Sequence, residues 1–271
     1  MADAAHFTVV DDGFRPTRFA QSHWGDDHLN GPAIVGLVAR HLQLECGATD
    51  FHPARLTVDL FRAARNVHTT LEVTVIRAGR RVHSAQCDVV QEGRAVARAT
   101  LVQYRRSAPP PGRLWHSDNS FPEPPPPDGS VLPFVGSDAA GWTRSPAGHQ
   151  NNSRKRFFND GIRVVDGEAN SPFVRAAMVA EATSLVTNLG TAGVGYINGD
   201  LTVALSRLPV DEWIGIQADS HHAADGIAVG TATLFDGQGA FGSAMTTAIA
   251  NPAAQIDFST REFGVSDLNY E

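Results

Sequence analysis

The stretch that decides the fold occurs twice in the chain, once in each half. It reads Leu56-Thr57-Val58-Asp59-Leu60-Phe61-Arg62 in the first half and Leu201-Thr202-Val203-Ala204-Leu205-Ser206-Arg207 in the second. Both copies have the form Leu-Thr-Val-x-Leu-x-Arg, and apolar and polar residues alternate along them. This period of two is typical of a strand with one buried face. The repeat therefore predicts two related units, each containing this strand.

Three further strands are predicted after each copy of the repeat. They cover residues 70–77, 82–91 and 95–104 in the first half, and residues 213–220, 227–235 and 240–250 in the second. Glycine-containing turns separate them at 78–80, 92–93, 224–226 and 236–237. Such turns between alternating runs are the strongest local signal of a β-hairpin. Each half is thus predicted to form a four-stranded antiparallel meander.

One helix is predicted before each meander. In the first half it begins near Pro32, a residue favoured in the first helical turn, and ends before Gly47. It is apolar almost all round and should be buried. In the second half Ser171 and Pro172 give an N-cap followed by proline, and the helix is predicted over residues 173–188. One apolar helix can fill the buried face of one curved sheet.

A proline-rich segment separates the two halves. Residues 107–130 contain two runs of consecutive prolines, which favour an extended spacer. We therefore expect an N-terminal unit over residues 1–106, a linker and connection over 107–150, and a C-terminal unit over 151–252. The tail over 253–271 is mostly polar and has no readable role.

Composition and charge exclude several classes of function. Hydrophobic residues make up 42% of the chain, enough for a sizeable core, and the formal net charge of −7 disfavours nucleic-acid binding. Almost every positive charge is arginine, which leaves a small phosphorylated ligand open. Two isolated cysteines, Cys46 and Cys87, predict no cysteine-based metal site, and no cofactor is expected. Without a signal peptide or an apolar run long enough to span a membrane, the protein is expected to be cytoplasmic.

The order of these elements resembles the type II acyl-CoA thioesterases, which are double-hotdog proteins. The matching motifs are Trp24-Gly25 and Asn30-Gly31-Pro32 at the first helix, Val179-Ala180-Glu181 in the second, and Ile197-Asn198-Gly199-Asp200 before the repeat. The resemblance covers about residues 14–252 and implies an α+β fold, with two antiparallel sheets each wrapped around a central helix. It also implies hydrolysis of fatty acyl-CoA thioesters to free fatty acid and CoA.

The resemblance places the candidate catalytic residues in the second half. A helix aspartate of the family falls at Glu181, a small polar residue falls near Asn198, and a glutamine of the last strand falls at Thr246. A carboxylate can act as general base on a water, and burial on an apolar helix should raise its pKa toward neutrality. The two strand and loop residues would orient that water. Thr247 is the alternative to Thr246, because neighbouring strand residues face opposite sides.

Each of these candidates has an ordinary structural alternative. The helix around Glu181 also carries Ser184 and Asn188, so the carboxylate could lie on a solvated face. Asn198 and Asp200 belong to an Asn-Gly-Asp sequence that favours turns. A threonine such as Thr246 is also favoured in strands for its shape alone.

Residues before the first helix are candidates for substrate binding. We assign His28, Asn30 and Gly31 to this role together with Asp200, and backbone N–H groups at Gly31 could stabilise an oxyanion. A polar cluster before a helix is also an ordinary capping segment, and both interpretations stay open.

The sequence thus predicts hydrolysis of acyl-CoA by water attack, without metal or covalent intermediate. The alternative is an inactive protein that binds acyl-CoA or lipid, favoured by threonine in place of the family's glutamine. A hotdog dehydratase is disfavoured because Asp27 and His28 are adjacent rather than a few residues apart. A monomer is feasible, and a homodimer of tandem chains is an equal expectation.

Overall fold

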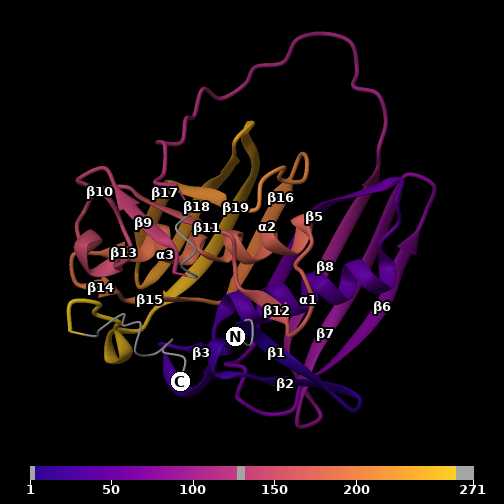
Figure 1. The fold of residues 1–271 in the computed structure, drawn as a ribbon, viewed down its shortest axis with the longest axis horizontal. Coiled ribbons are helices and arrows are strands. Elements are labelled where there is room, and N and C mark those ends of the chain that lie inside the picture. The colour runs from indigo at the N-terminus through magenta and orange to yellow at the C-terminus, as the bar shows by residue number, and fades with distance from the viewer. Residues whose placement is uncertain (1–3, 127–131, 261–271) are drawn as a thin grey trace.

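The structure of the protein, a computed structural model, describes residues 4–126 and 132–260. An antiparallel sheet of twelve strands carries most of the chain, and the helices lie against it (Figure 1). Its strands follow the order β10-β9-β11-β17-β18-β19-β16-β5-β8-β7-β6, and β15 also pairs with β19. A small sheet of β12, β1 and β2 lies near the N-terminus.

The elements of the first half, in chain order, are β1 (Ala5–Val10), β2 (Gly13–Pro16), η1 (Arg18–Ala20), β3 (Gln21–Ser22), β4 (Gly25–Leu29), α1 (Gly31–Cys46), β5 (Phe51–Leu60), β6 (Thr70–Ala78), β7 (Val82–Gln91) and β8 (Arg94–Arg105). Those of the second half are β9 (Phe134–Ser137), β10 (Ala140–Thr143), η2 (Pro146–His149), β11 (Lys155–Asn159), β12 (Arg163–Val165), α2 (Pro172–Glu181), α3 (Thr183–Asn188), β13 (Leu189–Gly190), β14 (Gly193–Val194), β15 (Tyr196–Asn198), β16 (Asp200–Leu205), β17 (Ile214–Ala224), β18 (Ile227–Asp236), β19 (Gly239–Ala250) and η3 (Pro252–Ala254).

All four predicted strands form in each half, β5 to β8 in the first and β16 to β19 in the second, but the predicted four-stranded meander is wrong. Only the last three strands of each set follow one another as hairpins, and the first strand pairs with the last, β5 with β8 and β16 with β19. Glycine-containing turns specify the hairpins, whereas the place of the first strand depends on pairing with a strand distant in sequence. Two of their tight turns have paired positive φ angles, 50° and 72° at Glu92 and Gly93, and 51° and 76° at Asp225 and Gly226. Two successive residues in this region give the turn whose twist matches that of the flanking strands.

The two sets of strands join where the repeated stretches meet. β5 and β16 pair antiparallel, with Thr57 opposite Thr202 and each flanking Leu opposite a Val of the other copy. The expected two sheets are therefore one continuous sheet. The physical reason is that each repeat would otherwise be an edge strand with unpaired N–H and C=O groups, which pairing satisfies.

Helix α1 forms as predicted. The Asn30 side chain accepts a hydrogen bond from the backbone N–H of Ala33 at 2.8 Å, Pro32 lies in the first turn, and Gly47 ends the helix. One long stretch of α1 is buried: Ala33, Ile34, Val35, Gly36, Leu37, Val38, Ala39 and Leu42.

The predicted second helix is broken at Ala182 into α2 and α3. The N–H of Ala182 bonds to the carbonyl of Val179, three residues back, and the Thr183 hydroxyl donates to the carbonyl of Ala180 at 2.6 Å. These bonds take acceptors that a continuous helix would use. Glu181 consequently ends α2 instead of lying in the middle of a longer helix.

Helices α1 and α2 pack antiparallel against each other. Gly36 lies against Met178 at the centre, and Ser171 donates a hydrogen bond to the Gln43 side chain at one end. At the other end Gly31 lies against Glu181. The first residue of α1 therefore meets the last residue of α2.

The connecting segment and the tail are only partly described. Residues 106–126 contain neither helix nor strand. The segment leaves β8 as an arch (Figure 1) and returns to the sheet at Phe121, which stacks on Phe235 of β18. β9 and β10 form within the stretch expected to be connection. Residues 127–131 and 261–271 lie outside the described residues. In the tail, Ile256 pairs with Val194 of β14, and Ile256 and Phe258 are both 5% exposed. None of the helices in the described residues is long and apolar enough to cross a membrane.

Candidate active site

A cavity of about 560 Å³ lies where the two helices meet. Its walls are mostly apolar side chains from both halves, and Glu181 is the only carboxylate lining it in the described part of the chain. Its polar lining residues are Ser22, His23, His28, Asn30, Arg62, Glu181, Ser184, Asn198 and Thr247. A mostly apolar cavity with a few convergent polar groups is the usual form of a small-molecule site.

The Glu181 carboxylate is held without a charged partner. Burial raises its pKa from 4.5 to about 7, and a hydrogen bond from the Asn198 side chain opposes part of that rise. In this bond Nδ2 of Asn198 donates to Oε1 of Glu181 at 3.1 Å. Across the described residues, Glu181 forms no ion pair. At neutral pH a large fraction of this group is therefore an available base.

Because Gly31 has no side chain, the Glu181 carboxylate can occupy the space beside it. A Cβ atom at this position would lie 2.0 Å from Oε1 of Glu181, so a larger residue would displace the carboxylate. The first N–H groups of a helix have no acceptor within the helix, and its N-terminus carries partial positive charge. Gly31 thus brings backbone and helix dipole directly against Glu181, at the place where an oxyanion could be stabilised.

The structure brings Asn198 to Glu181 but does not bring Thr246 into the cavity. Thr246 is 1% exposed, and its hydroxyl donates to the backbone carbonyl of Asp200 at 2.8 Å. Thr247 lines the cavity, as the alternative in the sequence analysis allowed.

Asp200 lies next to the cavity and bonds to Thr247, which lines it. Its carboxylate accepts hydrogen bonds from the backbone N–H of Thr247, at 2.8 Å, and from the Thr247 hydroxyl. Asp200 itself is not among the lining residues. Its contacts are those of a residue that fixes the position of Thr247.

The predicted substrate-binding residues before α1 line the cavity. His28, Asn30 and Gly31 all do so. The Asn30 side chain is also used by the fold, because it caps α1 and its amide donates to the carbonyls of Phe19, at 3.1 Å, and Gln21, at 3.2 Å. The capping interpretation is therefore confirmed for Asn30, which also lines the cavity.

Sequence reasoning missed the contribution of the tail and of the loop before β4. Ile256 and Phe258 line the cavity together with Trp24. The only signal in the sequence was the alternation of Ile256, Asp257 and Phe258, which is too short to predict a strand.

No metal-binding arrangement stands out in the structure. Across residues 4–126 and 132–260, no three His, Cys, Asp or Glu side chains lie close enough together to hold an ion. Both cysteines are free, and burial raises the pKa of the Cys87 thiol to about 12.

Two sequence-family models match most of the chain. The sequence model of the acyl-CoA thioesterase N-terminal domain matches residues 20–104, and that of the C-terminal domain matches residues 106–249. The chain belongs to the acyl-CoA thioesterase family. No curated protein sequence matches it.

Solved structures agree in fold. A candidate thioesterase II from Thermobifida fusca YX has 17% identity and a TM-score of 0.69, over 91% of this chain and 97% of that one. The tesB protein of Mycobacterium avium subs paratuberculosis has 16% identity and a TM-score of 0.62, over 91% and 96%. A conserved protein with a hot dog fold from Alicyclobacillus acidocaldarius has 14% identity and a TM-score of 0.63, over 92% and 97%. At these identities the likeness establishes the hotdog fold.

Proposed function

We propose that this protein is an acyl-CoA thioesterase in which Glu181 activates the attacking water. The observation that carries the proposal is the environment of Glu181, a carboxylate with a pKa of about 7 that lines an apolar cavity against Gly31 and Asn198. A general base is most effective when its pKa lies near the working pH. The arrangement matches that requirement.

The reaction would proceed without a covalent enzyme intermediate. Glu181 takes a proton from water as the water oxygen attacks the thioester carbonyl carbon. The carbonyl oxygen becomes an oxyanion beside the N-terminus of α1, where the Gly31 N–H and the helix dipole stabilise it. The C–S bond then breaks, and Glu181 returns its proton to the CoA sulfur. The products are a free carboxylic acid and CoA.

Asn198 and Thr247 would orient the water and the thioester. Asn198 donates to the carboxylate, which fixes the base in the cavity. The Asp200 carboxylate accepts a hydrogen bond from the backbone N–H of Thr247. The Thr246 hydroxyl donates to the backbone carbonyl of Asp200. In this proposal Thr246 acts as a positioning residue.

The cavity walls favour an alkyl chain. Leu60, Ile197, Ile227, Ile249 and Phe258 are among the apolar residues that line it. Burial of each methylene group contributes about 0.8 kcal/mol. Fatty acyl groups are therefore the proposed substrates.

The proposed architecture is a double hotdog. α1 with β5 to β8 forms one unit within residues 1–106, and α2 and α3 with β16 to β19 form the other within 151–252. The pairing of β5 with β16 supports this assignment, because it relates the two units through their repeated stretches.

The test is release of free thiol from acyl-CoAs of increasing chain length, by the wild type and by Glu181→Gln. We expect the wild type to release CoA and the variant to be slower by roughly 100-fold or more, as loss of a general base predicts. Glu45→Gln, on the exposed side of α1, is the matched control. If no acyl-CoA is turned over but one stabilises the wild type against heat, the inactive binding protein replaces this proposal.

A further inference from the structure

The arginine that ends each copy of the repeat has a different environment in the two halves. Arg207 forms a bidentate ion pair with Asp236, at 2.5 and 2.6 Å, and the Asp236 side chain is fully buried. Arg62 is exposed and lines the catalytic cavity, and its guanidinium has no partner within the described residues. The charge of Arg207 is therefore balanced by a carboxylate, whereas the charge of Arg62 is not.

The different surroundings of Arg207 and Arg62 follow from the residue that ends the third strand of each four-stranded set. Asp236 ends β18, and the residue that ends β7 in the first half is Gln91. Gln91 is neutral and 5% exposed, and its side chain binds both the N–H and the C=O of Arg65, each at 2.9 Å. It also donates to the Thr69 hydroxyl at 2.8 Å. Gln91 thus fixes the loop after β5 without neutralising Arg62.

This loop borders a groove that adjoins the cavity. Arg62, Arg65 and Arg94 line the groove, whose volume is about 550 Å³. The groove and the cavity share His28, Arg62 and Ala63. A ligand could therefore extend from one into the other without leaving the protein surface.

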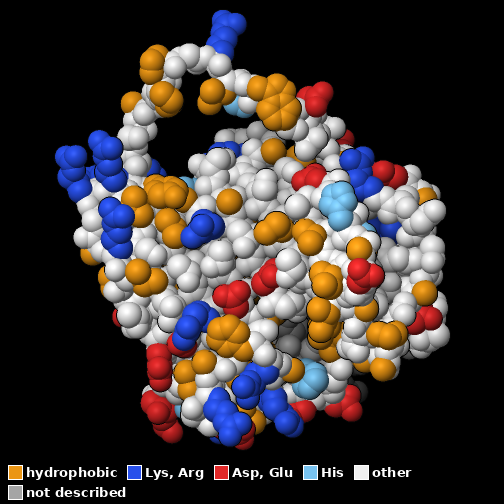
Figure 2. All heavy atoms as spheres, turned by 180° about the vertical axis from the view of Figure 1, so that it is seen from behind, with side chains coloured by type: hydrophobic (Ala, Val, Ile, Leu, Met, Phe, Trp, Pro, Cys, Tyr) orange, Lys and Arg blue, Asp and Glu red, His pale blue; other side chains and the backbone are white. Residues whose placement is uncertain are grey.

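The groove is positively charged on an acidic protein. Arg94 is exposed and, like Arg62, has no side-chain partner in the described part of the chain, whereas Arg65 pairs with Asp27. Glu92 is the only carboxylate among the lining residues. On the face drawn in Figure 2, basic side chains gather at the lower end with acidic side chains beside them. The formal net charge of the chain is −7. An anionic substrate approaching this chain meets overall repulsion, so a local cluster of free arginines has a strong effect on where it binds.

We propose that Arg62 and Arg94 bind the phosphates at the nucleotide end of CoA, while the thioester lies at Glu181. The guanidinium fork matches phosphate oxygens in two parallel hydrogen bonds, which a point charge cannot do. Arg65 contributes less because Asp27 already neutralises it. The groove then makes the protein selective for CoA thioesters over thioesters that lack phosphate. This inference rests on the proposed function.

The experiment compares kcat/KM for an acyl-CoA with kcat/KM for the same acyl group on N-acetylcysteamine, which carries no phosphate. We expect the ratio of the two values to fall about tenfold for Arg62→Ala and for Arg94→Ala, the size of one lost charge-assisted hydrogen bond. The ratio for Arg80→Ala, an exposed arginine at the opposite end of β7, should match the wild type. Raising the salt concentration should lower the ratio for the wild type more than for the double variant.

Calorimetric binding of free CoA separates this inference from the proposed function. If neither thioester is hydrolysed, the proposed function fails, and weaker CoA binding by the two arginine variants still supports the groove. If the variants bind CoA as tightly as the wild type does, the groove is not the phosphate site. The same conclusion follows if kcat/KM falls equally for the two thioesters. Wild-type protein that binds no CoA overturns the inference as well.

Discussion

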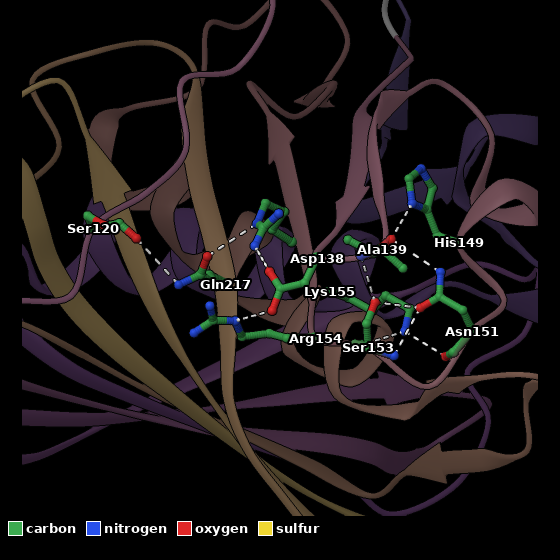
Figure 3. Close-up of polar contacts among 11 residues, drawn as sticks. Ser120, Asp138, Ala139, His149, Asn151, Ser153, Arg154, Lys155 and Gln217 are labelled. Carbon is green, nitrogen blue, oxygen red and sulfur yellow. Dashed lines mark hydrogen bonds and ion pairs between the residues drawn. The ribbon is translucent and has the colours of Figure 1, made fainter.

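Glu181 and Lys155 are two ionisable side chains whose pKa values are shifted by burial, and the fold gives them different partners. Lys155, the only lysine of the chain, is 2% exposed, and its ammonium donates hydrogen bonds to the carbonyls of Asn151, at 2.8 Å, and Ser153 (Figure 3). Burial lowers the pKa of this amine. Glu181 has one neutral amide donor, and its remaining lone pairs face the cavity.

The polar side chains around Lys155 are also hydrogen-bonded to one another. The ring of His149 is fully buried, and its two nitrogens lie 3.1 Å from the Ser137 hydroxyl and 2.9 Å from the Thr143 hydroxyl. Asn151 also donates to Ser137 at 3.2 Å. A buried polar network whose members are all bonded makes the fold rigid and specific.

The comparison separates a charge that the fold compensates from one to which we assign a role in the proposed reaction. Where the fold supplies hydrogen-bond acceptors for a buried ammonium, the charge is compensated within the protein itself. Where the fold supplies one partner and a cavity, the group is left to a water or substrate. The two groups differ in the partners that the fold gives them, and the proposed role of Glu181 depends on that difference.

The largest effect that sharpens this comparison should come from Gly31→Ala. The added methyl group would displace the Glu181 carboxylate, and a shift of about 1 Å costs on the order of 100-fold in rate. Steady-state kinetics on an acyl-CoA should show this loss in kcat/KM, while the thermal unfolding midpoint stays near that of the wild type.

A second variant shows whether space is the cause. Adding Glu181→Asp to Gly31→Ala shortens the acid by one methylene and should restore part of the activity. A double variant no more active than Gly31→Ala would mean that Gly31 acts otherwise than by making room for the carboxylate.

The pH dependence of the reaction should follow Glu181. Its base form is required, so kcat/KM should rise with pH around a midpoint of about 7. Between pH 7 and pH 5 the rate should fall roughly 50-fold, as the deprotonated fraction does. Asn198→Ala removes the hydrogen bond that lowers this pKa and should move the midpoint upward. A profile that stays flat down to pH 5 would rule out Glu181 as the base.

Titration of Glu181 should also change the stability of the fold, and as pH rises stability should fall while activity increases. Because its folded pKa is raised above the ordinary 4.5, the folded state holds the proton between pH 4.5 and 7 and the unfolded state does not. The free energy of unfolding should therefore decrease as pH rises through this window, by roughly 3 kcal/mol in total. Denaturant unfolding at pH 5 and pH 8 should show this decrease in the wild type and a smaller one in Glu181→Gln.

The sequence predicted the parts of the site that depend on local pattern. The repeated strand follows from spacing and residue type, and capping was one of the two interpretations left open for the polar cluster before α1. The carboxylate at Glu181 came from the family resemblance together with its place on an apolar helix. The break at Ala182 and the turn of Thr246 away from the cavity could not be predicted, because both depend on hydrogen bonds with carbonyls that only the fold brings near. The joined sheet also depends on pairing between residues about 145 positions apart in sequence, which no local pattern specifies.

The smallest effect should come from Lys155→Met, and it should appear in stability alone. Removing the ammonium leaves two carbonyls of the network without their donor, which should lower the free energy of unfolding by about 2 kcal/mol. Arg154→Met is the matched control, because Arg154 is half exposed and its contact with Asp138 is a surface ion pair that contributes about 1 kcal/mol or less. Denaturant unfolding measures both. Since Lys155 does not line the cavity that contains Glu181, kcat/KM per folded molecule should match the wild type. A loss of activity in Lys155→Met without a loss of stability would mean that the hydrogen-bonded network around Lys155 takes part in the reaction. The distinction between the charges of Lys155 and Glu181 would then fail.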